Sequence, residues 1–555
     1  MSVATEDAHP PLSRLFAPIS TSGLLVAAVF FGLSMTPSMV PRAPDLQGAL
    51  AGTMAAIGYF LWWLAIHLLL WLGFPLLRRA PQIKRAGLVI LALVIGAAFL
   101  LQGAEWQETI HAAWDLPPPE ASAPLRILAI ASAVFLVLLG AGRLFLGVVE
   151  RLQRGGKRFL PSRLAKAIGL VVAFSLFYTL IEGVAGRAAL RMIDNSARIA
   201  DAIIPPDAAP PTSSSISGGP GSLLDWQELG RWGRSFVAGG PTAEEIAAFW
   251  SGPALEPIRV YVGLNAAETP EARARLAFDE LVRTGGFGRA VLVIAMPTGS
   301  GWLDPGGMDT LDYIARGDVA TVSVQYSYLS SPVSVIVDPE KGLAEAQALF
   351  DIVYRHWATL PEATRPRLYL HGLSLGAFLS QETVPLLDLY AAPVDGALWV
   401  GSPYLSEFWQ MVRNRRHADS PAWRPRFGNG SLIRTMNQEG GLEPFDADWG
   451  PMRFVFLHYG SDPIVFFDWS LAWSRPDWLT GERAPDLSPQ MRWIPVVTLF
   501  QVGVDMALAL GTLGYGHDYA ARHYIPAWAE TLAPRGWTEA DAERLARHLG
   551  SLVPR

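Results

Sequence analysis

The sequence predicts an N-terminal all-α transmembrane bundle of about five spans, followed by an α/β domain with a mostly parallel sheet and cap insertions. Long apolar segments fill the first third of the 555-residue chain. Beyond them, short apolar runs alternate with helix-like segments, which is the pattern of a parallel sheet covered by helices on both faces. One of these runs ends in the pentapeptide Gly-Leu-Ser-Leu-Gly, residues 372–376.

The composition agrees with this division and excludes several classes of protein. Hydrophobic residues make up 51% of the chain and charged residues only 17%, which is too apolar for a wholly soluble protein of this length. The absence of cysteine excludes disulfides, thiolate zinc sites and a cysteine nucleophile. The net charge of −6 argues against nucleic-acid binding. We expect neither a metal nor another cofactor.

Five segments are each long and apolar enough to span a bilayer, which takes about 20 residues. They cover residues 20–41, 50–77, 86–105, 124–149 and 164–186. Loops 78–85 and 150–163 are rich in Lys and Arg, whereas loop 106–123 carries acidic residues and no Lys or Arg. Because basic loops stay in the cytoplasm, we expect the N-terminal segment 1–19 to be cytoplasmic and everything after the fifth span to lie outside.

The transmembrane domain, residues 20–187, is followed by a connecting segment over 188–222. Its first part, to about residue 203, is predicted as a short helix that prolongs the last span or lies along the membrane surface. Residues 204–222 are rich in Pro, Ser and Gly, a composition typical of an extended, poorly ordered linker. The α/β domain then covers residues 223–555.

Alternating strands and helices define the α/β domain. The predicted strands are 258–263, 291–296, 319–326, 367–371, 396–400 and 452–459, and the predicted helices are 269–284, 339–357 and 375–390. Two long, tryptophan-rich stretches interrupt this order at about 402–450 and 463–513. We expect them to form a cap over the functional site, with an apolar lining that favours an acyl substrate. The alternative is that their aromatic residues form small cores of their own.

The pentapeptide stands between a predicted strand and a predicted helix, which is the context of a nucleophile elbow. In such a turn the serine adopts strained backbone, and the residues two before and two after it must lack a Cβ. Gly372 and Gly376 meet this requirement. Ser374 is therefore the candidate nucleophile.

Two residues downstream complete a candidate triad, because α/β-hydrolases place Ser, an acid and His in that chain order. Asp462 follows a predicted strand, at the sheet edge that carries active sites. His517 lies in a glycine-rich loop near the C-terminus. We predict His517 as the general base and Asp462 as the acid that holds its imidazole in the useful tautomer. Three alternatives remain: Asp468 as the acid, Asp462 as a turn residue that caps the backbone, and His517 as a surface histidine.

Two other histidines are predicted to be structural. His371 stands at a strand end next to the nucleophile, where packing or a supporting hydrogen bond is its expected role. His458 lies within a predicted strand. Neither is placed in the triad.

Acyl transfer also requires backbone N–H groups that meet the negative charge on the carbonyl oxygen. The residue after the nucleophile, Leu375, is expected to supply one donor. The loop 297–302 follows strand 291–296 and contains two glycines that allow its amides to point inward. Thr298 and Gly299 are the candidates in this loop. The alternative is an ordinary strand-to-helix loop.

Short motifs spread over nearly the whole chain resemble those of a known protein family. They are Arg259–Leu264, Thr298–Pro305, Gln325–Leu329, Ser374–Gly376, Asp395–Trp399, Ser461–Pro463, Pro476–Trp478, Met491–Thr498 and Gly516–His517. Together they resemble a bacterial α/β-hydrolase family with an N-terminal multi-span membrane domain. The resemblance implies the hydrolase fold and a serine nucleophile at Ser374, and it implies no substrate. Relatives often carry a glutamate before the serine, where this chain has Leu373.

These observations predict a membrane-embedded serine hydrolase of the bacterial cytoplasmic (inner) membrane that cleaves carboxylic esters on the outer side. A lipid or other apolar acyl ester is the expected substrate, because the spans hold the site near the bilayer. A homo-oligomer formed through the transmembrane domain is compatible with the sequence. Two alternatives stay open: an acyltransferase with the same triad, and a membrane transport or sensor protein with a non-catalytic hydrolase domain.

Overall fold

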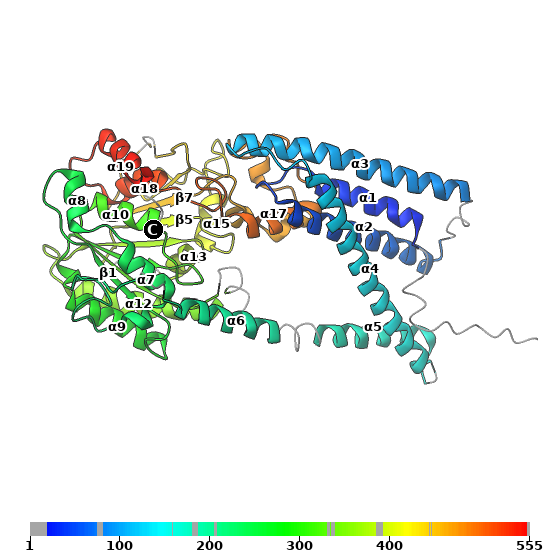
Figure 1. Ribbon diagram of the computed structural model, residues 1–555, viewed down its shortest axis with the longest axis horizontal. Helices are drawn as coiled ribbons and strands as arrows, with labels where there is room; N and C mark the ends of the chain where they lie inside the picture. The colour runs from blue at the N-terminus through cyan, green and yellow to red at the C-terminus, as the bar shows by residue number, and fades with distance from the viewer. Residues whose placement is uncertain are drawn as a thin grey trace, which may run out of the picture. The chain divides into compact units, whose positions relative to one another are not determined.

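The chain forms two compact units in the computed structural model (Figure 1). The structure describes residues 19–551 apart from 75–81, 158, 180–186, 205–207, 330–333, 335–338, 384–391, 443–444 and 446. The helical unit comprises the chain up to Arg191, together with Trp469–Leu479 and Leu487–Leu508. The sheet unit comprises Met192–Asp468, Thr480–Asp486 and the chain from Ala509 onward. Three predicted parts of the chain lie outside the described residues: the N-terminal segment, much of the first basic loop and the end of the fifth span.

Long apolar helices build the helical unit. They are α1 (Thr21–Ser34), α2 (Pro44–Trp71), α3 (Gln82–Ala113), α4 (Ala123–Gly156) and α5 (Ser162–Tyr178). Among the described residues, three helices are long and apolar enough to cross a membrane, over Pro44–Trp71, Arg85–Ala113 and Ala123–Gly156. Helices α1 and α5 fall on the first and fifth predicted spans but have 14 and 17 residues. At 1.5 Å per residue α1 reaches only about 21 Å, short of a ~30 Å hydrocarbon core.

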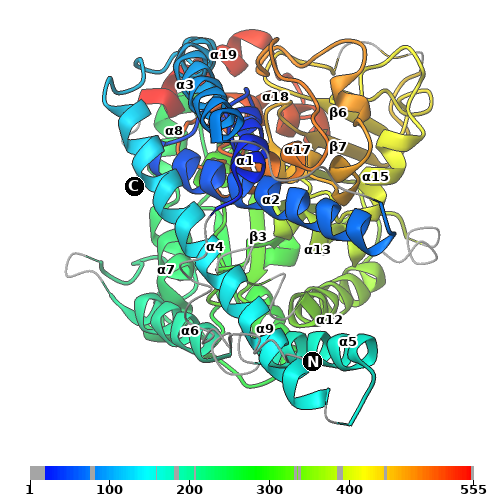
Figure 2. The same ribbon diagram turned by 90° about the vertical axis from the view of Figure 1, so that its right-hand side faces the viewer.

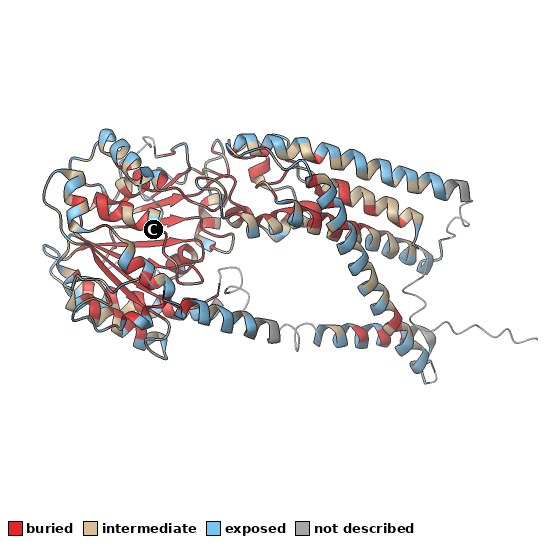
Figure 3. Ribbon diagram, viewed as in Figure 1, coloured by how far each residue is buried: buried red, intermediate tan, exposed pale blue. Residues whose placement is uncertain are grey.

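Small residues allow α2 and α4 to approach closely. A Cβ on Gly52 would lie 2.5 Å from the carbonyl oxygen of Ala131, and one on Gly48 would lie 3.0 Å from that of Ile127. Close backbone packing of this kind is typical of helices in membranes. The outer faces of the unit are largely exposed (Figure 3), and they carry apolar side chains such as Leu93, Leu125 and Val137.

The sheet unit contains seven strands in the order β1-β3-β2-β4-β5-β7-β6. They are β1 (Ile258–Val262), β2 (Val291–Met296), β3 (Val319–Val324), β4 (Arg367–Leu373), β5 (Gly396–Val400), β6 (Ile433–Met436) and β7 (Arg453–Leu457). The strands are buried almost throughout (Figure 3) because both faces of the sheet are covered. The predicted parallel sheet is confirmed, and every strand pair in it is parallel.

Helices cover both faces of this sheet (Figure 1). One face carries α9 (Pro270–Arg283), α12 (Pro339–Thr359) and α13 (Leu375–Glu382), and the other carries α7 (Gly230–Gly239), α10 (Pro305–Ile314) and α18 (Ala521–Leu532). The sheet unit also contains α6 (Arg187–Ala202) for most of its length, α8 (Ala243–Trp250), α15 (Glu407–Asn414), α16 (Pro463–Phe466) and α19 (Glu539–Ser551). This layering leaves the carboxyl ends of the strands to carry loops.

The two tryptophan-rich stretches, which are predicted as a cap, contain elements that the sequence analysis did not predict. The stretch 402–450 contributes β6, which pairs with β7 at the edge of the sheet. Four residues are too few for a recognisable strand pattern, so the sequence did not reveal it. The stretch 463–513 is divided between the units, because Trp469–Leu479 and Leu487–Leu508 belong to the helical unit. That part includes α17 (Val497–Leu508), which packs against α1 and α2 (Figure 2).

The Pro-, Ser- and Gly-rich segment is not a poorly ordered linker over its described part. Ile216 forms a parallel bridge with Arg259 of β1, and the N–H of Ser217 donates to the carbonyl of Arg259 at 3.1 Å. The Oγ of Ser217 accepts a hydrogen bond from the N–H of Tyr261 at 3.2 Å. Edge strand β1 has backbone groups that need partners, and this segment supplies them.

Candidate active site

Ser374 lies in the sharp turn between β4 and α13, at the carboxyl end of the middle strand of the sheet. Its backbone angles are φ 57° and ψ −125°, a region that residues with a Cβ rarely adopt. Its N–H donates to the carbonyl oxygen of Val400 at 2.9 Å. The residue is buried, with 5% of its surface exposed. This is the backbone conformation expected of a nucleophile elbow.

The two glycines of the pentapeptide make the turn sterically possible. A Cβ on Gly372 would lie 2.3 Å from the backbone of Gly376. A Cβ on Gly376 would lie 2.2 Å from the carbonyl oxygen of Met296, at the end of β2. Real Cβ atoms do not approach backbone this closely, so both positions require glycine.

Asp462 lies in the turn after β7 and has no exposed surface. Its two carboxylate oxygens have different partners. Oδ1 accepts the N–H of Ile464 at 2.9 Å and so caps the short helix α16. Oδ2 accepts hydrogen bonds from Nδ1 of His517 at 2.7 Å and from the hydroxyl of Tyr519 at 2.8 Å. Asp462 is therefore both a turn-capping residue and the partner of His517. Asp468 stays the alternative acid.

Tyr519 is a site residue that the sequence prediction missed. Burial, and then the negative charge of Asp462, raise the pKa of the Tyr519 hydroxyl well above its usual value. The hydroxyl therefore stays protonated and keeps donating to the carboxylate. Tyr519 also stacks on Tyr459, with ring centroids 4.2 Å apart. The only signal in the sequence was its place two residues after His517, which follows Gly516.

His517 is held by its backbone as well as by Asp462. Its N–H donates to the carbonyl of Ala509 at 2.7 Å, and the N–H of Gly516 donates to the Oγ of Ser461 at 3.0 Å. The side chain is buried, with 4% exposed. The alternative of a surface histidine is therefore wrong.

Gly401 brings the imidazole of His517 to the nucleophile turn. A Cβ on Gly401, whose φ is +54°, would lie 2.6 Å from Cε1 of His517. Gly401 directly follows Val400, whose carbonyl accepts the N–H of Ser374. Ser374 and His517 thus flank the same two residues at the carboxyl end of β5. The Nε2 atom of His517 is buried and has no hydrogen-bond partner among the residues that the structure describes.

His371 and His458 have structural surroundings. Nδ1 of His371 contacts the carbonyl of Leu398 at 2.8 Å, and its ring lies against Trp528 of α18. Burial lowers the pKa of His371 to about 4. Nε2 of His458 accepts the N–H of Ser402 at 3.0 Å, and burial lowers the pKa of His458 well below its usual value. Both rings are therefore neutral near pH 7.

The start of the loop 297–302 lies against the elbow, since a Cβ on Gly376 would lie 2.2 Å from the carbonyl oxygen of Met296 and 2.9 Å from that of Pro297. Its own turn uses the N–H of Thr298, which donates to the carbonyl of Trp302 at 2.9 Å. Thr298 stays a prediction as a backbone oxyanion donor, although its N–H is engaged in this turn. Leu375 and Gly299 stay predictions, and the N–H of Leu375 belongs to the first turn of α13, where amides have no acceptor within the helix.

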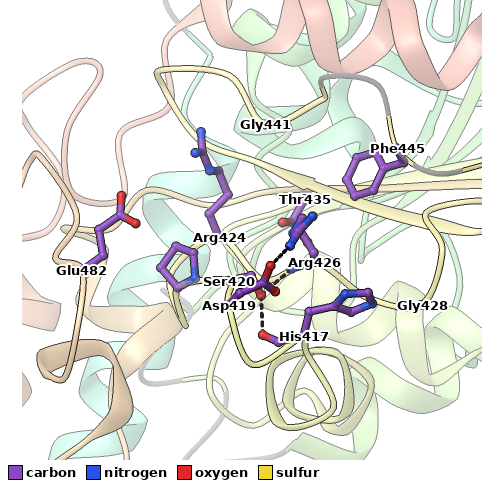
Figure 4. Close-up of a pocket in the computed structure, with 11 residues that line it drawn as sticks. His417, Asp419, Ser420, Arg424, Arg426, Gly428, Thr435, Gly441, Phe445 and Glu482 are labelled. Atoms are coloured by element: carbon purple, nitrogen blue, oxygen red, sulfur yellow. Dashed lines mark hydrogen bonds and ion pairs between the residues drawn. The ribbon is translucent and has the colours of Figure 1, made fainter.

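A cavity of about 330 Å³ lies elsewhere in the sheet unit (Figure 4). Its walls include His417, Arg424, Thr435 and Glu482. Arg426 and Asp419, which form an ion pair, also line it (Figure 4). None of the predicted catalytic residues lines it. Within the described part of the chain, no group of three or more His, Cys, Asp or Glu side chains is placed to hold a metal ion.

The sheet is all-parallel, and a strained serine follows its middle strand. A buried His–Asp pair lies at the end of the neighbouring strand β5. Together these features define an α/β-hydrolase. The profile of an alpha/beta-hydrolase family matches residues 258–545, and that of the N-terminal region of such a family matches residues 35–241. The chain belongs to this α/β-hydrolase family. A comparison with curated proteins gives no match. A solved alpha-beta serine hydrolase homologue from Coxiella burnetii is similar at 16% identity and TM-score 0.18, over 31% of this chain and 77% of that one.

The elbow packing predicts that Gly376→Ala destabilises the protein. The added methyl group would meet the carbonyl of Met296 at 2.2 Å, so the backbone must shift at a cost of about 1–3 kcal/mol. Thermal unfolding of the purified proteins measures this change. Gly288→Ala is the matched control, because a Cβ there meets nothing within 4 Å. An unchanged unfolding midpoint for Gly376→Ala would contradict this packing.

The buried neutral state of His371 predicts a loss of stability in acid. Its pKa falls from 6.5 to about 4 on folding. Its contribution to the free energy of unfolding is therefore complete above pH 6.5 and is lost as the pH falls toward 4. The contribution amounts to about 3 kcal/mol at most. His371→Asn should therefore lose less stability than wild type between these pH values, as followed by thermal unfolding. Identical acid dependence of the two proteins would show that His371 is not buried as a neutral ring.

Proposed function

We propose that this protein is a membrane-embedded serine esterase that cleaves carboxylic esters through an acyl-enzyme on Ser374. The observation that carries the proposal is the convergence of the strained Ser374 turn and the buried His517–Asp462 pair on the carboxyl end of β5. Membership of the α/β-hydrolase family supports hydrolysis. The ester bond, the triad roles and the membrane location go beyond that membership and are part of the proposal.

His517 acts first as a base and then as an acid. Its Nδ1 donates to Asp462 at 2.7 Å, which leaves the lone pair on Nε2 for the hydroxyl of Ser374. As Oγ attacks the carbonyl carbon, its proton moves to Nε2. The C–O bond to the alcohol then breaks, and the same proton goes to the departing oxygen. Water repeats the sequence on the acyl-enzyme, and it releases the carboxylic acid and restores Ser374.

The negative charge on the carbonyl oxygen needs donors in both tetrahedral intermediates. The N–H of Leu375 is the first of them, because it follows the nucleophile at the start of α13. The second comes from the loop at Gly299, which lies next to the elbow. A buried site strengthens these hydrogen bonds relative to water.

The helical unit supports a location in the membrane. Three of its helices have the length and apolar character of spans, and their outer faces expose leucine and valine. Together with the charge of the loops, this supports a cytoplasmic N-terminus and a hydrolase domain outside a bacterial cytoplasmic membrane. A lipid or other apolar acyl ester is the proposed substrate, and the exposed helix faces leave room for a homo-oligomer. A reporter fused after residue 200 tests the topology, and a cytoplasmic signal would contradict it.

Fluorophosphonate labelling of detergent-purified protein tests the nucleophile. We expect wild type to be labelled and Ser374→Ala to lose the label while it keeps the wild-type unfolding midpoint. Neighbouring Ser380, a buried serine of α13, provides the control, since Ser380→Ala should keep the label. A series of chromogenic esters then defines the acyl chain. A folded wild type without label would favour a non-catalytic hydrolase domain.

Replacement of the acid should identify the triad aspartate. Asp462→Asn leaves the size of the side chain unchanged but no longer holds the His517 tautomer, so we expect kcat to fall by about 10³–10⁴-fold. Asp468→Asn is the matched control and should change kcat by less than roughly tenfold. Initial rates with a chromogenic ester measure both. A larger loss in Asp468→Asn than in Asp462→Asn would assign the role to Asp468.

A further inference from the structure

The loop 297–302 of the sheet unit is closed on itself by two backbone hydrogen bonds. The N–H of Gly301 donates to the carbonyl of Thr298 at 2.9 Å, and the N–H of Thr298 donates to the carbonyl of Trp302 at 2.9 Å. In a planar trans peptide group the carbonyl and the N–H point in opposite directions. The Thr298 carbonyl points at Gly301, so the N–H of Gly299 in the same peptide group points out of the loop. The direction of this amide therefore depends on where Gly301 is held.

Tyr261 holds the carbonyl of Gly301. It lies on the edge strand β1 and has no exposed surface, and its hydroxyl donates to the Gly301 carbonyl oxygen at 2.7 Å. Burial raises the pKa of this hydroxyl well above its usual value, so it stays protonated and keeps donating. Gly301 is itself buried, and a buried carbonyl without a donor is costly. The loop therefore keeps this contact.

Gln325 holds the preceding carbonyl. It follows β3 and is also fully buried. Its Nε2 donates to the carbonyl of Ser300 at 3.0 Å. The other acceptors within reach of Nε2, on Ser327 and Asp201, lie 3.2 and 3.4 Å away. Its Oε1 accepts the N–H of Leu264 at 3.2 Å, so the amide group has one defined orientation.

Glycine at position 301 lets the loop backbone pack directly on both side chains. A Cβ on Gly301, whose φ is +94°, would lie 2.5 Å from the hydroxyl oxygen of Tyr261 and 2.8 Å from Cγ of Gln325. The strands β1, β3, β2 and β4 are neighbours in that order, so both side chains reach the loop after β2 from the side away from β4. The elbow meets the start of the loop, at Met296 and Pro297. The loop is thus held from two sides.

We infer that Tyr261 and Gln325 are positioning residues for the oxyanion loop. By holding the carbonyls of Gly301 and Ser300 they fix the direction of the loop amides, that of Gly299 included. These roles rest on the proposed function, because they require the loop to supply the second oxyanion donor. Such donors are effective when their direction is set before the charge develops. Neither side chain takes part in the chemical steps.

Tyr261→Phe removes one hydroxyl and keeps the ring, so it changes the packing least. With a chromogenic ester we expect kcat to fall roughly tenfold to 100-fold while KM changes by less than about twofold. The reason is that the loop amides act on the charge of the tetrahedral intermediate and not on the bound ester.

Binding of a transition-state analogue separates this effect from a general disturbance of the site. A trifluoromethyl ketone with the acyl chain of the ester forms a tetrahedral adduct on Ser374. The new bond joins Oγ to the carbonyl carbon, the serine proton passes to His517, and the carbonyl oxygen becomes negatively charged. In Tyr261→Phe the inhibition constant should rise by the same factor by which kcat/KM falls.

Tyr354→Phe is the matched control. The hydroxyl of Tyr354, on α12, also donates to a backbone carbonyl, that of Ala392 at 2.8 Å, but this carbonyl lies outside the loop 297–302. The control should leave kcat and the inhibition constant within about twofold of the wild-type values.

Gln325→Met tests the second contact, because methionine has a similar length but cannot donate to the Ser300 carbonyl. It should show the same lower kcat, steady KM and weaker inhibition, and it keeps the test decisive if the unfolding midpoint shows that Tyr261→Phe fails to fold. In folded variants, kcat within about twofold of wild type would overturn the inference alone, as would a lower kcat with an unchanged inhibition constant. A wild type with neither ester turnover nor fluorophosphonate label would overturn the proposed function, and this inference with it.

Discussion

The carboxylate of Asp462 is the group on which the arrangement of the site depends. It is fully buried, and the backbone of Ile464, the ring of His517 and the hydroxyl of Tyr519 all donate to it. A buried charge without such donors would cost several kcal/mol. The fold therefore keeps the turn after β7 and the C-terminal loop together, and His517 is placed beside the Ser374 turn as a result.

The sequence predicted the central part of the fold because fully buried parallel strands are continuous apolar runs. Strands β2 and β5 were predicted with the bounds that the structure gives. Strand β6 was missed, because its four residues are recognisable as a strand only from their pairing with β7. Helix α17 was placed in a cap because its apolar composition does not say which unit it packs in.

The candidate site was predictable where its requirements are local. Gly372, Ser374 and Gly376 follow from the geometry of one turn, and chain order pointed to His517 and Asp462. The roles of Tyr519 and of the Thr298 amide depend on which groups meet in space, and one sequence carries no signal for that. The same holds for the segment around Ser217, whose composition indicates a linker although its backbone pairs with β1.

The most direct measurement is mass-spectrometric mapping of the acyl-enzyme, after an acid quench in the first turnovers of a chromogenic ester. The account predicts one acyl group on the peptide that contains Ser374, formed together with a burst of released alcohol. It also predicts that the acyl group disappears once the ester is exhausted. An acyl group on another residue, or ester turnover with no covalent species and no burst, would contradict the assignment of Ser374 as the nucleophile.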